Sequence, residues 1–458
     1  ISAYSGYDME RSENSDIAAV ASINRSLDES YDQYSQELRF VSPGGEIIDW
    51  IAGGYYQYSE LDISRKNNAL DFLQSGPLGV RGALLSTQPP IPSTFDQDSD
   101  SWAVFGQATW NATNTLRVTG GIRYNEETKD LDKVTEQDEL KIRFGPELTF
   151  FANPLNGDLV DDLRSHSFTN LSRDEEKWTF SGNLQWDATD NAMLYASVST
   201  GFKGGGYDEN YSNEGEIVRK ANPATGELTG EQRAGVDASV LNFDDETVLA
   251  YELGAKMGLL DGAAELNLAI FRMEYDDLQV SSLVGDVYVV GNAGEAISQG
   301  VELDGRWLVT ERLTIGGSVA YLDAEYDDFK GATCTVPQTT DPLNNPGCLR
   351  DDGSNIEQPL EPGGQDLTDE SLLFAPDWSA NINAQYIFPL TGGMEIITGI
   401  DVNYTDEFYS ALDLDPNTKH DDVTKVNARI ALASIDDTWS VAVIGKNLTD
   451  EDSHMWNN

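Results

Sequence analysis

Apolar and polar residues alternate along the chain in long runs, and the clearest run extends from Trp178 to Phe202. Between Trp178 and Trp186 every second residue is apolar or glycine, and the residues between them are polar. Small and Asx residues at 187–190 can form a turn, after which the alternation resumes. Because successive strand side chains point to opposite faces, this stretch predicts a β-hairpin with one apolar and one polar face.

The same alternation recurs along the whole chain and predicts about fifteen antiparallel strands. They are expected at 1–8, 31–42, 46–58, 101–110, 116–125, 178–187, 194–202, 248–259, 266–275, 297–308, 313–321, 378–388, 394–404, 423–433 and 439–447. Most are roughly ten residues long, whereas strands of soluble proteins usually have about five or six. A tilted strand needs about nine to eleven residues to cross a bilayer, so the lengths favour membrane-spanning strands.

The connections between these strands also alternate. Every second one is a few residues of Asn, Asp, Gly, Thr or Pro, and the others are roughly fifteen to fifty residues long, as in outer-membrane barrels. Charged residues recur on the polar face, which suits a wet lumen. The sequence therefore predicts an all-β transmembrane antiparallel barrel with short periplasmic turns and long extracellular loops. Single-chain bacterial barrels have even strand numbers, so we expect at least one further strand.

Tryptophans mark the two ends of the expected strands. Those beside short turns are Trp110, Trp186, Trp307 and Trp439, and those at the opposite ends are Trp102, Trp178 and Trp378. Barrels carry aromatic girdles at both membrane interfaces, so we expect outer-membrane lipid to contact these seven side chains. The simpler alternative is the general preference of tryptophan for strands.

The composition narrows the possible partners. The chain has 458 residues, 39% of them hydrophobic, and a formal net charge of -50. Its mean hydropathy of -0.41 would indicate a soluble protein, but barrel strands are only half apolar and give a weak signal. The negative field argues against nucleic acid as a partner. Acidic loops could attract cations, or could simply be solvated.

Little in the sequence indicates catalysis, a cofactor or a metal centre. The three histidines form no HExxH motif, and neither a GxSxG motif nor a P-loop is present. Asp96, Asp98 and Asp100 have the spacing of a calcium loop but lack its glycine and distal glutamate. Cys334 and Cys348 lie in one polar loop with no zinc-like spacing, so we expect a disulfide in an oxidising compartment.

Several ordered motifs resemble those of TonB-dependent outer-membrane receptors of the siderophore-receptor kind. They are Ser35-Gln-Glu-Leu-Arg39 with Pro43-Gly-Gly, Ala103-Val-Phe-Gly-Gln-Ala108 with Gly120-Gly-Ile-Arg-Tyr124, Tyr195-Ala-Ser-Val-Ser-Thr-Gly-Phe-Lys203, Tyr251-Glu-Leu-Gly254, Gly300-Val-Glu-Leu303, Phe374-Ala-Pro-Asp-Trp378 and Gly445-Lys-Asn-Leu-Thr-Asp450. Each is weak alone, but together they cover nearly the whole chain. The resemblance implies a Gram-negative outer-membrane location and energised import of a bulky ligand, most often a ferric siderophore.

The chain departs from the family in its extent. The resemblance implies a barrel of twenty-two strands, an N-terminal plug and a short segment that engages TonB. Residues 1–458 are therefore expected to be an incomplete barrel domain, with about fifteen of the strands and without plug, first strands or last strand. The plug would make the contact with the TonB complex.

The expected functional surface is the outer mouth of the lumen. Tyr195, Phe202, Lys203 and Tyr207 lie where a strand becomes a long loop, and such groups could stack on or hydrogen-bond a bulky ligand. They could equally be ordinary girdle and loop residues. Two alternative functions stay open, which are a passive porin-like channel and a soluble β-rich adhesin or carbohydrate-binding protein.

Overall fold

The computed structural model describes residues 1–14, 24–68, 91–135, 140–142, 159–161, 166–209, 217–221, 228–232, 238–284, 287–292, 294–349 and 364–452. The last residues of the sequence, 453–458, lie outside this set. One sheet dominates the described residues. Its strands are β1 (Ser2–Asn14), β2 (Asn24–Val41), β3 (Ile48–Asn68), β4 (Ile91–Asn111), β5 (Leu116–Thr135), β8 (His166–Thr189), β9 (Ala192–Lys203), β14 (Glu246–Leu259), β15 (Ala264–Asp276), β18 (Glu295–Thr310), β19 (Leu313–Asp328), β23 (Trp378–Leu390), β24 (Met394–Thr405), β27 (Val423–Ser434) and β28 (Ser440–Gly445).

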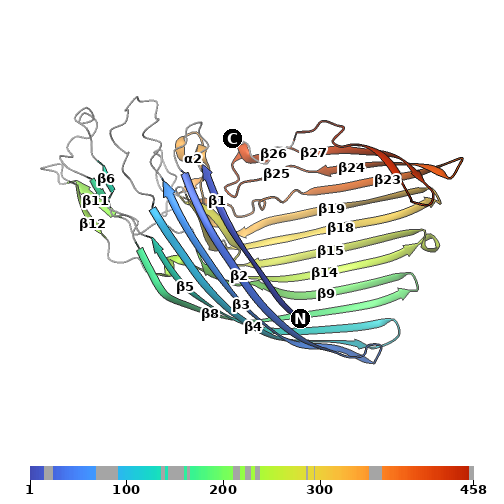
Figure 1. The fold of residues 1–458 in the computed structure, drawn as a ribbon, viewed down its shortest axis with the longest axis horizontal. Coiled ribbons are helices and arrows are strands. Elements are labelled where there is room, and N and C mark those ends of the chain that lie inside the picture. The colour runs from blue at the N-terminus through green and yellow to red at the C-terminus, as the bar shows by residue number, and fades with distance from the viewer. Residues whose placement is uncertain are drawn as a thin grey trace.

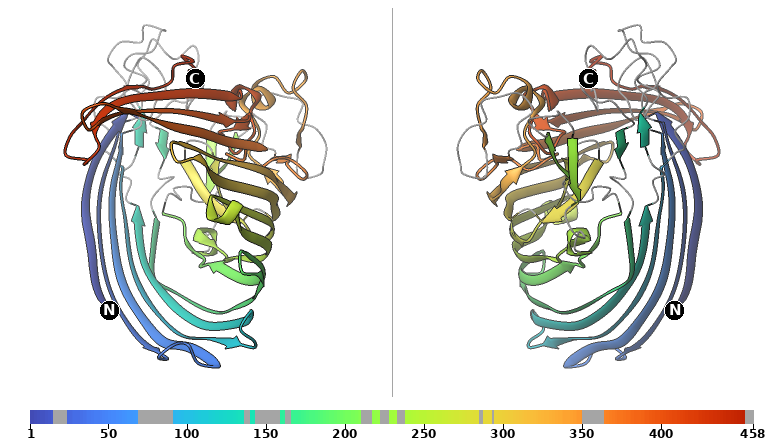
Figure 2. Two further views of the ribbon diagram at one scale, coloured as in Figure 1. Left: turned by 90° about the vertical axis from the view of Figure 1, so that its right-hand side faces the viewer. Right: turned by 90° about the vertical axis from the view of Figure 1, so that its left-hand side faces the viewer.

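These strands form a single 15-stranded sheet in which sequence neighbours pair, from β1 at one end to β28 at the other. Every pairing is antiparallel, so the expected number of strands and their up-and-down order are confirmed. Figure 1 shows the strands side by side from blue to red, with short turns at one end and the long connections at the other. Figure 2 looks along the strands and shows the sheet curled, so that one face is concave.

The register sorts side chains onto the two faces as the alternation predicts. Leu184 is paired with Val118 on one side and Ala196 on the other, and these apolar side chains share the convex face. Gln185 lies on the concave face and accepts a hydrogen bond of 3.2 Å from Arg117. Large apolar side chains of the convex face are half exposed, for example Leu184 at 45%, because nothing in the described part of the chain covers them. An exposed apolar band over many strands is the surface that a membrane would cover.

On the concave face, aromatic rings lie over glycines of the facing strand. Tyr195 is paired with Gly254, where an added Cβ would fall 2.3 Å from the tyrosine ring. Phe105 lies over Gly53 in the same manner, at 2.6 Å. A ring that covers a facing glycine replaces the missing side-chain contact and helps to fix the strand register.

Strands β3, β4, β5 and β8 are longer than the sequence indicated. We expected polar loops at 60–99 and 126–176, but these strands continue about ten residues beyond the aromatic positions. Here the convex face turns acidic, so the sequence looks uniformly polar. The concave face keeps a small apolar set that includes Ile63, Phe95 and Leu131, all buried. The strands therefore continue beyond the apolar band of the convex face, and we call this part the strand extension.

Few helical residues occur in the described part of the chain. The α-helix α2 (Val336–Thr340) is a single short turn. Among the described residues no helix is long and apolar enough to cross a membrane.

Candidate functional site

The segment that follows β9 folds back against the strand extension. It contains β10 (Gly206–Tyr207), which pairs with β13 (Asn242–Phe243). Tyr207 and Leu241 are buried against the apolar set of β3, β4 and β5, with Leu241 fully covered. This burial anchors residues 204–209 to the concave wall, and we call those residues the strap.

Lysine 133 binds the strap from inside the wall. Its ammonium group donates to the backbone oxygens of Asp208 and Glu209 at 3.2 and 2.7 Å, and lies 5.7 Å from the centre of the Phe95 ring. The side chain is only 1% exposed, and this burial lowers the pKa of Lys133 to about 8, although Asp208 opposes the shift. Lys133 is therefore part of the packing and not a free ligand-binding cation.

The two faces of the strand extension carry opposite charges. On the concave face Arg65 pairs with Glu209 of the strap at 2.6 Å, and Lys129 donates to the strap oxygen of Gly205 at 2.6 Å. On the convex face the register aligns two rows of three carboxylates, Asp62, Asp96 and Asp132, then Glu60, Asp98 and Asp130. Burial and the two neighbouring carboxylates raise the pKa of Asp96. These charges leave a strongly acidic outer rim.

The calcium-like spacing at Asp96, Asp98 and Asp100 lies in strand β4. An extended strand cannot wrap around an ion as a calcium loop does. Among the described residues, no group of three or more His, Cys, Asp or Glu side chains could hold a metal ion.

The four residues expected at the mouth do not come together. Tyr195 lies on the concave wall close to the short turn between β8 and β9, so its expected place at the start of a long loop is wrong. It donates a short hydrogen bond to Glu252. Lys203 lies at the end of β9 opposite Glu246, exposed and on the same face as Tyr195. Phe202 alternates onto the convex face with Val198, and Tyr207 is buried in the strap. A ligand in the lumen could reach Tyr195 and Lys203, whose role in binding stays a prediction.

All seven expected girdle tryptophans have exposed side chains, between 40% and 56%. Trp178 packs on Tyr124 with ring centres 4.8 Å apart, and Tyr124 packs on Trp102 at 5.3 Å. Trp378 packs on Tyr321 at 4.9 Å. The register places these aromatic rows on the convex face, on the side of the apolar band away from the short turns. Their contact with lipid stays a prediction.

A second packed region joins the two long connections near the C-terminal strands. The first, between β19 and β23, contains α2, β20 (Lys330–Ala332), β21 (Cys348–Leu349) and β22 (Gly364–Asp366). The second, between β24 and β27, contains β25 (Phe408–Tyr409) and β26 (Lys419–His420). Tyr326, Phe329 and Leu367 are buried together with Leu414 of the second connection. The sequence analysis predicted that the two cysteines lie in a polar loop. The apolar cluster in this connection corrects that expectation.

Cys334 and Cys348 form the expected disulfide, with Cα atoms 5.6 Å apart. Both residues are buried, Cys348 at 1% exposure. The bond ties the start of α2 to β21, so it holds the fold of the loop around one turn of helix. Thr335 next to Cys334 caps that helix, because its hydroxyl accepts from the backbone nitrogen of Gln338 at 3.3 Å.

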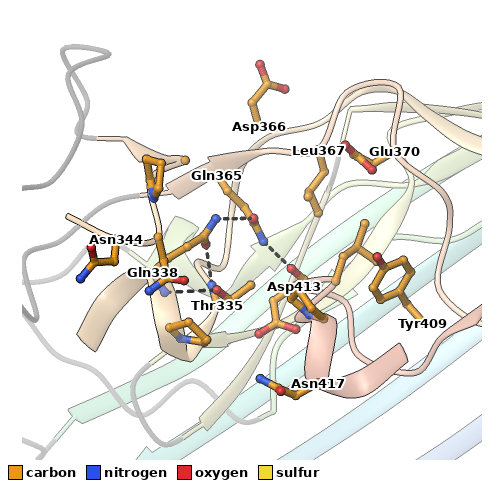
Figure 3. A pocket seen from close by; sticks show the side chains of 16 residues that line it. Thr335, Gln338, Asn344, Gln365, Asp366, Leu367, Glu370, Tyr409, Asp413 and Asn417 are labelled. Atoms are coloured by element: carbon orange, nitrogen blue, oxygen red, sulfur yellow. Dashed lines mark hydrogen bonds between the residues drawn. The ribbon is translucent and has the colours of Figure 1, made fainter. Parts of the chain in front are cut away.

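A pocket of about 680 Å³ lies between these two connections (Figure 3). Its lining is mostly polar and consists of Thr335, Pro337, Gln338, Asn344, Asn345, Pro346, Gly347, Gln365, Asp366, Leu367, Glu370, Tyr409, Asp413, Leu414, Pro416 and Asn417. We call it the loop pocket. Sites for small ligands are typically clefts of about 300–1,000 Å³ with a few well-placed polar groups.

Gln365 clamps the walls of the loop pocket together. Its amide nitrogen donates to the backbone oxygens of Thr333 and Asp413, at 2.7 and 2.6 Å. Its amide oxygen accepts from Gln338 at 3.3 Å, and Figure 3 shows the bonds from Gln365 to Gln338 and to residue 413. A buried side chain that satisfies both its donor and acceptor groups across three segments fixes their relative positions.

Polar groups also line the concave wall below the loops. Asp401 accepts from Asn381 at 2.6 Å and from Asn427 at 2.9 Å, and Arg117 forms a salt bridge of 2.8 Å with Asp187. This wall is compatible with water and with a polar ligand, and it presents no catalytic arrangement among the described residues.

Sequence reasoning missed the strap anchors, the loop pocket and the role of Gln365. Each depends on contacts between connections far apart in the sequence. The only local signal was the presence of apolar residues such as Ile63, Phe95 and Leu131 within polar stretches. The cysteine pair was visible because two cysteines in one loop leave a single pairing.

Known proteins with similar sequences and structures agree on the class. The family described as TonB dependent receptor-like, beta-barrel matches residues 2–448. The pesticin receptor of Yersinia pestis is 24% identical over 282 residues, which is 61% of this chain and 32% of that protein. The metal-pseudopaline receptor CntO of Pseudomonas aeruginosa is 32% identical over 114 residues, which is 24% of this chain and 16% of that protein.

The crystal structure of the ferric yersiniabactin uptake receptor FyuA from Yersinia pestis has the same fold, with a TM-score of 0.63 and 16% identity. The comparison covers 98% of this chain and 53% of that one. The chain thus spans about half the length of that receptor. It belongs to the TonB-dependent receptor β-barrel family, a class of Gram-negative outer-membrane proteins that are receptors and transporters and not enzymes.

Proposed function

We propose that the whole protein is an outer-membrane transporter that imports a scarce, bulky ligand by TonB-energised uptake, and that the ligand is a ferric siderophore. The observation that carries this proposal is the architecture of one end of the sheet. A wide, curved sheet with a polar concave wall ends in two packed loop regions that enclose a ligand-sized pocket. The names of two relatives, which mention metal-pseudopaline and ferric yersiniabactin, support a metal complex as cargo.

In this proposal the described sheet is part of a larger barrel. The number of strands is odd, β1 and β28 each pair with one described strand, and the relatives are longer. In the whole protein a plug domain would fill the lumen and contact the TonB complex. Lys203, at the mouth end of β9, and Tyr195, lower on the same concave wall near the short turn, would contact the ligand.

Uptake of radioactive iron tests the proposal. Cells that make the full-length protein are given ⁵⁵Fe-labelled siderophores under iron limitation, with and without a functional TonB. We expect accumulation that requires TonB and the proton-motive force. Uptake that persists without TonB would instead identify a passive channel, and a protein that stays in solution without detergent would identify a soluble adhesin.

A further inference from the structure

The loop pocket is a preformed site rather than a chance gap between loops. The disulfide between Cys334 and Cys348 holds one wall, and the Gln365 clamp joins that wall to residue 413. The apolar cluster of Tyr326, Phe329 and Leu414 supports the floor. A site whose walls are already ordered loses less entropy when a ligand binds.

The polar lining of the loop pocket is made of amides and carboxylates. The amides are Gln338, Asn344, Asn345, Gln365 and Asn417, and the carboxylates are Asp366, Glu370 and Asp413. Among the described residues that line it, none is a lysine, arginine or histidine. The positions of the carboxylates are set partly by the backbone, because Asp366 accepts from the nitrogen of Thr368 at 3.1 Å and Asp413 from that of Asp415 at 3.2 Å.

Two lysines in the described part of these connections already have acidic partners. Lys419 lies 5.6 Å from the centre of the Tyr409 ring but bonds Glu407 at 2.7 Å. Lys330 forms a salt bridge with Asp328. An anionic ligand in the loop pocket would therefore meet carboxylates without a matching cation, and would lose hydration without compensation.

We propose that the loop pocket is a binding site for ferric chelates that carry no net negative charge and present hydrogen-bond donors, such as hydroxyl, amide or ammonium groups. This inference rests on the proposed function and specifies its substrate class. Carboxylates accept from such donors strongly, and side-chain amides accept and donate. Ferric trihydroxamates belong to the class, because three singly charged hydroxamates neutralise the iron. Ferric tris-catecholates, which are triply negative, do not.

Two probes of similar size and opposite charge test this inference on the full-length protein purified in detergent. One is a ferric trihydroxamate with a free ammonium group, and the other is a ferric tris-catecholate. Calorimetric titration measures both dissociation constants. We expect the cationic complex to bind at least tenfold more tightly than the anionic one.

Isosteric variants then locate the binding. Glu370→Gln and Asp413→Asn each remove one charge from the lining. Each should weaken the cationic complex about three- to tenfold, which corresponds to about 0.6–1.4 kcal/mol, because a hydrogen bond to a charged group is replaced by one to a neutral amide. Asp369→Asn is the matched control. It removes the same charge next to Glu370 at a residue outside the lining, and asparagine tolerates the positive φ of 65° found there.

Each outcome decides the inference. Tighter binding of the anionic complex overturns the substrate class, and so does the absence of binding by either probe. Equal effects of all three substitutions overturn the location. TonB-dependent uptake of a tris-catecholate would overturn this inference while leaving the proposed function intact, whereas TonB-independent uptake would overturn the proposed function itself. A heat-modifiable band on electrophoresis confirms that each variant is folded.

Discussion

Gly254 is a residue at which one added methyl group would disturb the concave wall. An added Cβ would fall 2.3 Å from the ring of Tyr195, which is held by its hydrogen bond to Glu252. Gly254→Ala should therefore destabilise the protein by about 1–3 kcal/mol. Gly258→Ala, on the same strand and face, is the control, because its nearest neighbour is 3.8 Å away. Urea unfolding in detergent measures both, and equal effects would contradict the ring-over-glycine packing.

Lys133 makes the free energy of unfolding depend on pH. Burial lowers its pKa from 10.5 to about 8 in the folded protein. Between these values the unfolded chain binds more protons, so stability should rise with pH from about 8 to 10.5 and be lost as pH falls through 8. The contribution is about 1–3 kcal/mol. Subtracting the unfolding profile of Lys133→Met isolates this residue, and a difference that is constant across pH would refute its depressed pKa.

Some of these residue-level features were visible in the sequence and others were not. The faces of Leu184 and Gln185 follow from alternation alone, because a strand has only two faces. The burial of Lys133 and Tyr207 does not, since it depends on a strap that comes from a different part of the chain. Phe202 was assigned to a binding surface by its place at a strand end, yet its register puts it on the convex face with Val198.

At the scale of single elements, the hairpin of β8 and β9 provides a test of the membrane face. Leu184 lies in its middle on the convex face, beside Val118 and Ala196. Leu184→Arg should cost about 2–4 kcal/mol if this face meets lipid near the midplane. Asn183→Arg is the control on the concave face, where Thr119 and Ser197 are its neighbours. Reversible folding into liposomes measures both, and the reverse order would exclude the assignment of faces.

The lengths of β3, β4, β5 and β8 show where element prediction failed and why. In the membrane the convex face must be apolar, so alternation is easy to see. Above the membrane the convex face is acidic, and only residues such as Ile63 and Leu131 still mark the covered face. A polar stretch with only a few apolar residues was therefore interpreted as a loop, because no alternation of apolar and polar residues could be recognised in it.

The disulfide is expected to stabilise its own loop without determining whether the sheet folds. Cys334 and Cys348 are 14 residues apart, and closing a loop of that size contributes about 3 kcal/mol by the chain-entropy estimate. The Cys334→Ser, Cys348→Ser double variant should be cut by protease within residues 333–349, while the barrel keeps its thermal stability. Limited proteolysis with mass spectrometry locates the cuts. An unchanged cleavage pattern would show that the apolar cluster around Phe329 suffices.

For the whole molecule, strand number and order followed from the sequence because each hairpin is local and up-and-down order needs no long-range information. The loop pocket could not be predicted, since its walls come from residues 335–347, 365–370 and 409–417, which are joined by the Gln365 clamp and by burial of Leu414. The connections pack through tertiary contacts, and such contacts leave no periodic pattern in the sequence.

The net charge of -50 should act on association rather than on the fold. Aligned carboxylates such as Asp62, Asp96 and Asp132 form an acidic rim on the strand extension, and Glu370 and Asp413 continue the negative field into the loop pocket. This field should attract a cationic ferric complex, and salt should screen it as the Debye length falls from about 30 Å at 0.01 M to about 8 Å at 0.15 M. We expect its association rate constant to fall about tenfold over that range, with little change in the dissociation rate. Stopped-flow tryptophan fluorescence measures both rates, and an uncharged trihydroxamate is the control whose association should be almost independent of salt. Equal salt dependence for the two complexes would mean that the acidic residues only keep the loops solvated.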